Sequence, residues 1–98
     1  MFVMTRKYNG CSNAKETNRI IENVVQGITA LPGFHSYGVV DLGDGQVATM
    51  SLFDTREQAM HSADVARGLI QDKDNHLAAL LPNPPEITMG EVLSLHRK

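Results

Sequence analysis

The sequence predicts one α+β domain with the ferredoxin-like element order β-α-β-β-α-β. Two runs rich in Val, Thr, Tyr and Phe flank Gly43-Asp44-Gly45, which predicts a hairpin at the middle of the 98 residues. A strand-like and a helix-like segment precede this hairpin, and a helix-like and a strand-like segment follow it. Right-handed crossovers around the hairpin would give an antiparallel four-stranded sheet with both helices on one face.

The segment before the hairpin is predicted to form a strand and one helix. Residues 2–8 alternate loosely in polarity, as a strand does. Asn13 and Glu16 have the spacing of a capping box, which marks a helix start. Apolar residues recur at three- and four-residue steps between residues 20 and 31, so they share one helical face. Pro32-Gly33 is expected to end this helix.

The two hairpin strands, at residues 33–42 and 46–53, carry bulky side chains on both faces. The first of them places Val40 and Leu42 on one face and Tyr37 on the other. A strand with one solvent-exposed face would alternate more cleanly between apolar and polar residues. The two helices can cover only one face of the sheet, so we expect a second copy of the chain to cover the other. The prediction is a homodimer formed through sheet faces.

The segment after the hairpin is predicted to form a second helix, a connector and the last strand. Thr55 and Gln58 have capping-box spacing at the helix start. The polar residues 72–76 are expected to break the helix, with a short extra turn at 77–81. Pro82-Asn83-Pro84-Pro85 is a stiff connector, because its prolines cannot continue a helix. The last strand is predicted at residues 87–96.

Composition excludes several classes of protein and partner. The formal net charge is −2, and basic residues cluster only at Arg97-Lys98, so nucleic acid is not the expected partner. Cys11 is the sole cysteine, which rules out a disulfide framework within the chain. No run approaches the roughly 20 apolar residues of a membrane span. The N-terminus lacks the pattern of a signal peptide, so we expect a cytoplasmic protein.

A protein metal site within one subunit is not expected. The four histidines, at positions 35, 61, 76 and 96, include no pair with the i, i+4 spacing of a zinc-binding helix. The single cysteine cannot by itself supply a thiolate site.

His35 and Tyr37 are the candidate catalytic residues. They lie two residues apart and are therefore expected on one face of a strand. A histidine can move a proton near neutral pH, and a tyrosine can hold a phenolate or enolate oxygen. The alternative is structural: both side chains would lie in the dimer interface and form hydrogen bonds across it.

The candidate substrate-binding residues lie on the other strands. Arg6 and Tyr8 share a face of the first strand, where Arg6 could hold a substrate anion. The alternative for Arg6 is an ion pair with Glu91, which falls on the apolar face of the last strand and must be either paired or poised as a base. Thr49 and Ser51 alternate on one face of the central strand and could line a small polar pocket.

The order of elements resembles the antibiotic-biosynthesis-monooxygenase-like group of the dimeric α+β barrel superfamily. The residues that carry this resemblance are Leu-Pro-Gly-Phe at 31–34, Tyr37, the Asp-Gly strand start and Thr-Arg-Glu at 55–57. It covers nearly the whole chain and implies two sheets packed face to face, with a pocket between the helices and the sheet of each subunit. Known members include cofactor-independent oxygenases of aromatic polyketides, haem-degrading proteins and enzymes that isomerise or cyclise small molecules.

The resemblance implies two alternative functions. One is an enzyme or binding protein that acts, without a tightly bound cofactor, on a small aromatic or enolisable compound. The other is a non-catalytic homodimer that binds a metabolite or serves as a regulatory or stress-response module. Asn9 and His76 match two positions of the haem-degrading pattern, which makes His76 a candidate ligand-binding residue, but the chain contains no Trp to complete that pattern.

Overall fold

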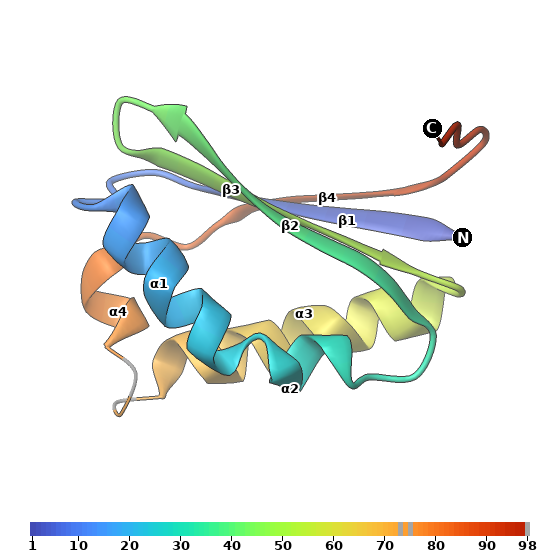
Figure 1. Cartoon of the computed structure of the whole chain (residues 1–98), viewed down its shortest axis with the longest axis horizontal. Coiled ribbons are helices and arrows are strands. Elements are labelled where there is room, and N and C mark those ends of the chain that lie inside the picture. The colour runs from blue at the N-terminus through green and yellow to red at the C-terminus, as the bar shows by residue number, and fades with distance from the viewer. Residues whose placement is uncertain (73, 75, 98) are drawn as a thin grey trace.

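One antiparallel sheet with strand order β2-β3-β1-β4 is formed in the computed structural model, which describes residues 1–72, 74 and 76–97. The helices lie together on one face of this sheet (Figure 1). The strands are β1 (Phe2–Tyr8), β2 (Phe34–Gly43), β3 (Gln46–Phe53) and β4 (Glu86–Glu91). The helices are α1 (Ala14–Val24), α2 (Gln26–Thr29), α3 (Arg56–Gln71) and α4 (Leu77–Leu80). The predicted fold class is confirmed.

The β2–β3 hairpin turns through Asp44-Gly45, as predicted. Both residues have positive φ, 54° and 77°, which is the geometry of a tight two-residue hairpin turn. Gly45 also lies against the loop after β1, where its carbonyl accepts a hydrogen bond of 2.9 Å from the Cys11 amide. A Cβ at position 45 would lie 3.3 Å from the Cys11 carbonyl oxygen, so glycine is favoured for two reasons.

The single helix predicted up to residue 31 is wrong, because the helix divides at Val25. Its start is at the predicted place, where the Asn13 side chain accepts a hydrogen bond from the Glu16 amide, but the capping box is only half formed because the Glu16 carboxylate bonds to Arg19. After Val25 the helix tightens, since the Ile28 amide bonds to the Val25 carbonyl at 2.8 Å, and α2 runs in a different direction from α1 (Figure 1). Gly27, a poor helix former, lets α2 pack closely on Leu69 of α3.

The second helical region agrees better with the prediction. Thr55 and Gln58 form the complete capping box, with both reciprocal hydrogen bonds present. The short extra turn exists as α4. The break predicted at residues 72–76 includes Lys73 and Asn75, which lie outside the described residues.

The last strand ends at Glu91, so its predicted extension to residue 96 is wrong. β4 pairs only with β1, and Glu91 is already opposite Phe2. One further backbone hydrogen bond joins the Val92 amide to the carbonyl of Met1, the residue before β1. Leu93 and Leu95 follow the strand with exposed fractions of 92% and 51%, because no strand remains for their backbone to pair with.

The two faces of the sheet differ in cover. On the helix face, Phe53 and Val47 of β3 are fully buried, Phe53 in a cluster with Ile28 and Val47 in a cluster with Leu81. On the open face, Val40 and Met50 are 50% and 45% exposed, and Leu42, in the irregular pairing just before the turn, is 49% exposed. Across the described part of the chain, no helix has the length and apolar character needed to cross a membrane.

Candidate functional site

Five polar side chains gather on the helix face of the sheet, and we call them the interior polar cluster. They are Arg6 and Tyr8 of β1, Tyr37 of β2, and Thr49 and Ser51 of β3. The strand register brings them together, because Arg6 lies opposite Thr49 and Tyr37 lies opposite Ser51. Arg6 is only 3% exposed, which is rare for an arginine.

The cluster holds polar atoms that have no partner within the described residues. Arg6 Nε, Thr49 Oγ1 and Ser51 Oγ are buried without a hydrogen bond of normal geometry there. The guanidinium Nη1 donates a weak hydrogen bond of 3.8 Å to the Met4 sulfur. A guanidinium keeps its charge at any ordinary pH, so Arg6 is a buried cation, and no ion pair among the described residues includes it.

Arg6 also acts on the two tyrosines. Burial raises the pKa of Tyr8 above its ordinary 10.0, and the nearby positive charge of Arg6 offsets part of that rise. Burial likewise raises the pKa of Tyr37, with Arg6 and Thr49 opposing the rise. Both phenols are therefore neutral near pH 7 and are available as hydrogen-bond donors.

A cleft of about 470 Å³ opens from the surface to this cluster, and we call it the Pro-rich cleft. Arg6 and Tyr8 form its inner wall, α3 and α4 contribute Arg67, Ile70 and neighbouring residues, and its rim is the connector of residues 82–85. Its volume lies in the range of ordinary small-molecule sites. The Asn83 side chain donates a 3.1 Å hydrogen bond to the Asn9 carbonyl and so ties the connector to the end of β1.

A second, much smaller cavity lies deeper, between Tyr8, Tyr37 and Thr49. It measures about 30 Å³, so it has room for little more than one water molecule. Ile70 and Leu81 line both this cavity and the Pro-rich cleft and stand between them. Tyr8 lines both spaces, whereas Tyr37 lines the small cavity and not the Pro-rich cleft.

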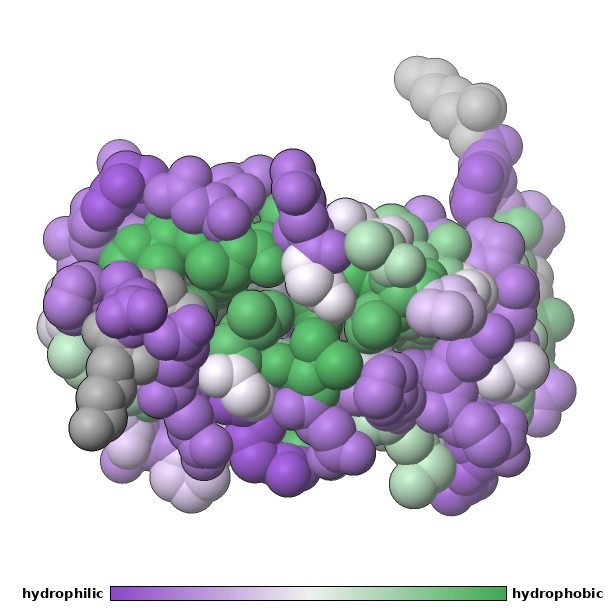
Figure 2. Space-filling model, turned by 90° about the horizontal axis from the view of Figure 1, so that it is seen from below, coloured by the Kyte–Doolittle hydropathy of each residue, from purple (hydrophilic) through white to green (hydrophobic). Residues whose placement is uncertain are grey.

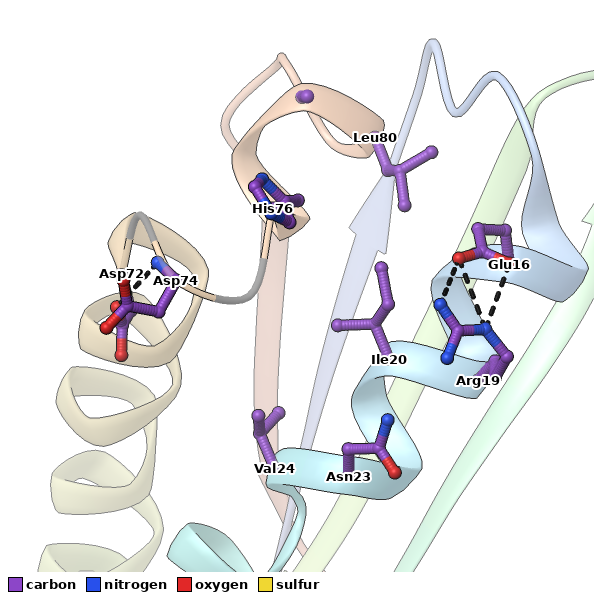
Figure 3. Close-up of a pocket in the computed structure, with 10 residues that line it drawn as sticks. Glu16, Arg19, Ile20, Asn23, Val24, Asp72, Asp74, His76 and Leu80 are labelled. Carbon is purple, nitrogen blue, oxygen red and sulfur yellow. Dashed lines mark hydrogen bonds and ion pairs between the residues drawn. The ribbon is translucent and has the colours of Figure 1, made fainter.

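His76 lies elsewhere, in an open groove of about 660 Å³ between α1 and α4. Figure 3 shows Ile20, Val24 and Leu80 pointing into this groove, with the Glu16–Arg19 ion pair on α1 at one side. From the helix side, apolar side chains gather in the middle of the surface within a polar border (Figure 2). His76 is therefore not part of the interior polar cluster.

His35 also lies apart from Tyr37. The β2–β3 register shifts between Phe34 and Ser36, so His35 occupies a bulge. Its Nε2 lies 2.5 Å from the Asp54 carboxylate, outside the cluster. The expectation that His35 and Tyr37 share a face is wrong because the bulge breaks the two-residue alternation. Tyr37 faces the helices, which also contradicts the alternative that it lies between two paired sheets.

The proposed Arg6–Glu91 ion pair is likewise not formed within the described residues. Arg6 lies opposite Ile87, whereas Glu91 lies opposite Phe2 at the far end of β4 and is exposed. Thr49 and Ser51 share a buried face, as predicted. Sequence reasoning missed Arg67, which follows Ala63 and precedes Ile70 at helical spacing and so lines the same cleft.

Among the residues that the structure describes, no three His, Cys, Asp or Glu side chains are grouped so that they could hold a metal ion. Cys11 is buried, and its sulfur lies 3.3 Å from the Thr17 hydroxyl. What the cluster offers chemically is a cation and a neutral phenol, Arg6 and Tyr8, in the wall of the Pro-rich cleft, with the Tyr37 phenol in the adjoining small cavity. Such a set can hold and stabilise an anionic oxygen.

No protein-family model matches this sequence, and no curated protein matches it. Solved structures do match. NE2512, a protein of unknown function from Nitrosomonas europaea, superposes with a TM-score of 0.75 at 15% identity, over 99% of this chain and 93% of that one. A monooxygenase from the gene ActVA-Orf6 of Streptomyces coelicolor, solved with nanaomycin D, gives 0.68 at 18% identity, over 99% and 91%.

A third structure, that of the cofactor-independent oxygenase SnoaB from Streptomyces nogalater, gives a TM-score of 0.64 at 10% identity. The match covers 99% of this chain and 97% of that one. Likeness at such low identity concerns the fold. The chain has the ferredoxin-like α+β fold of the antibiotic biosynthesis monooxygenase-like proteins, the group that its sequence resembles.

Proposed function

We propose that this protein binds a small aromatic or enolisable compound in the Pro-rich cleft and oxidises it with molecular oxygen, without a tightly bound cofactor. One observation carries the proposal: a buried guanidinium with no ion-pair partner among the described residues and the neutral Tyr8 phenol line a cleft of about 470 Å³, and the Tyr37 phenol lines the small cavity that adjoins it at Tyr8. The fold shared with ActVA-Orf6 and SnoaB adds support by analogy.

In this scheme Arg6 holds an anionic oxygen of the substrate. Tyr8, with Tyr37 behind it, donates a hydrogen bond to the oxygen that becomes an enolate when the substrate loses a proton to solvent. The electron-rich carbon then reacts with O₂ to give a hydroperoxide, which loses water. For a CH₂ centre the balance is one O₂ consumed, one carbonyl formed and one water released. Stabilising the enolate lowers the barrier, because the positive charge and donors are already in place.

We also propose that two copies pair through their open sheet faces. Val40, Leu42 and Met50 would be about half exposed on a lone subunit, and pairing would bury them. The Pro-rich cleft lies on the helix side, so it would remain open in such a dimer. The match to ActVA-Orf6 and SnoaB in fold supports this arrangement.

A second candidate function is binding without catalysis. The space beside Tyr37 is only about 30 Å³ and is closed by apolar residues such as Ile28, Leu69 and Leu77. A ligand confined to the outer cleft would contact Arg6 and Tyr8 without reaching Tyr37. This observation favours a metabolite-binding or regulatory module.

Oxygen uptake distinguishes the two functions. We expect the protein to accelerate O₂ consumption by at least one member of a panel of hydroquinones and anthrones, and Tyr37→Phe to lower kcat about 100-fold, the loss typical of removing one donor that stabilises an oxyanion. Ser94→Ala, which removes a hydroxyl far from the cleft, is the control. Binding of panel members with no O₂ consumption would support the second candidate and reject catalysis.

A further inference from the structure

We infer that the ligand of the Pro-rich cleft carries a carboxylate that is already ionised when it binds, attached to a flat apolar body, and that Arg6 receives this carboxylate. The inference rests on the proposed function in one respect: it takes the Pro-rich cleft as the ligand site. It goes further by naming the chemical class of the ligand.

Arg6 has no counter-charge among the described residues. Arg6 is 3% exposed, its Nε has no partner among the described residues, and it faces the cleft. Burying a lone charge is costly, and the cost falls when an opposite charge occupies the site. None of the side chains that line the cleft is an Asp or a Glu. The counter-ion that this part of the chain lacks is therefore supplied by the ligand.

The charge of the cleft comes from two arginines, Arg6 and Arg67. Arg67 lies at the outer end of the cleft. It forms a 3.2 Å ion pair with Asp64, and its side chain is 62% exposed. One buried guanidinium and one partly neutralised one suit a monoanion better than a doubly charged phosphate. The planar fork of N–H groups on arginine also matches the two oxygens of a carboxylate.

The apolar walls of the cleft indicate what the ligand is like apart from its carboxylate. Beyond the two arginines, the walls include Ile70, Leu81, Ile87 and the prolines of the connector. Such walls bury an apolar ring rather than a sugar or a peptide. An acid whose ring bears a neighbouring hydroxyl would place that oxygen beside Tyr8.

The test compares two compounds of nearly the same shape, 2-naphthoate and 2-naphthamide, in which the amide lacks the charge and replaces one acceptor oxygen with an NH₂ donor. Isothermal titration calorimetry on the whole protein should show 2-naphthoate binding roughly tenfold more tightly or better, which corresponds to one charge-assisted hydrogen bond. Added salt should weaken the binding of 2-naphthoate and leave that of 2-naphthamide unchanged.

Three variants identify which arginine causes the preference for 2-naphthoate over 2-naphthamide. Arg6→Met should abolish the preference for the acid. Arg67→Gln, a surface change that does not threaten folding, should lower the affinity for 2-naphthoate about threefold and leave 2-naphthamide unaffected. Arg19→Gln is the matched control, because Arg19 is also an exposed helical arginine in an i, i+3 ion pair, but it lies on α1 in the other groove.

Several outcomes would overturn the inference. Equal affinity for the two compounds would do so while leaving the proposed oxidation intact, since oxygen uptake tests that separately. A preference that survives Arg6→Met would assign the anion to another group. A preference lost in Arg19→Gln and kept in Arg67→Gln would move the site to the groove between α1 and α4. Binding of neither compound at millimolar concentration would remove the carboxylate site.

Discussion

Arg6 and Thr49 lie directly opposite each other on β1 and β3, both buried beneath the helices, and each keeps a polar atom without a hydrogen-bond partner among the described residues. A core optimised for stability alone would not contain such a pair, because unpaired buried polar atoms are destabilising. The pair is better explained as part of a site that a ligand completes. The predictions below follow from this arrangement.

Replacing the buried cation should stabilise the protein. Arg6→Met keeps a long flexible side chain and removes an uncompensated charge, so we expect the free energy of unfolding to rise by about 1 kcal/mol or more. Urea denaturation measures this. Arg19→Met on the surface should change stability by less than roughly 0.5 kcal/mol. A clear loss of stability in Arg6→Met alone would mean that Arg6 has a structural partner.

The two tyrosines should resist ionisation in the folded protein. The chain contains two Tyr and no Trp, so the ultraviolet absorbance of tyrosinate reports Tyr8 and Tyr37 alone. Burial raises both pKa values, so the folded state binds more protons than the unfolded state above about pH 10. The contribution of the two neutral phenols to the stability of the folded state is complete below about pH 10, and it is lost as pH rises through the folded pKa values. Absorbance should therefore appear above pH 10 together with unfolding. Reversible titration near pH 10 in the folded protein would contradict the burial of these phenols.

The open face of the sheet should control association. Met50→Glu places a charge at the centre of that face and should convert the proposed dimer to monomer in sedimentation experiments. Met60→Glu is the matched control, because Met60 is 51% exposed on α3, against 45% for Met50. Met60→Glu should leave the dimer intact. If both variants sediment like the unaltered protein, the open face is not the interface.

The connector of residues 82–85 should affect how long a ligand stays in the Pro-rich cleft. Asn83→Ala removes the hydrogen bond to the Asn9 carbonyl that holds the rim closed, and its net value is roughly 0.5–1.5 kcal/mol. We expect faster dissociation of 2-naphthoate with little change in its association rate. Stopped-flow kinetics measures both rates, with Asn18→Ala on the surface of α1 as control. Unchanged dissociation would show that the rim does not limit release.

Local signals predicted most of the fold. The Asp44-Gly45 turn, the cap at Asn13 and the capping box at Thr55 each have a short-range physical cause, and the structure has all three. The failures have long-range causes. β4 ends at Glu91 because β1 has no more residues to pair with, which no pattern within residues 87–96 could reveal.

The residues of the candidate site were predicted only in part, because local signals again succeeded where long-range packing did not intervene. Two-residue alternation placed Arg6 with Tyr8 and Thr49 with Ser51 correctly, since β1 and β3 pair without a bulge. It failed for His35, because a bulge in β2 turns that side chain toward Asp54. The role of Arg67 depends on how α3 lies over the sheet, and that packing is a property of the whole fold.

A crystal structure of the protein with 2-naphthoate tests the central claim most directly. We expect the ring between Ile70 and the connector of residues 82–85, with the carboxylate within hydrogen-bond distance of Arg6 and the adjacent ring edge near the Tyr8 hydroxyl. A ligand bound in the groove beside His76, or an empty Pro-rich cleft in which the Arg6 guanidinium remains unpaired at saturating 2-naphthoate, would contradict the account.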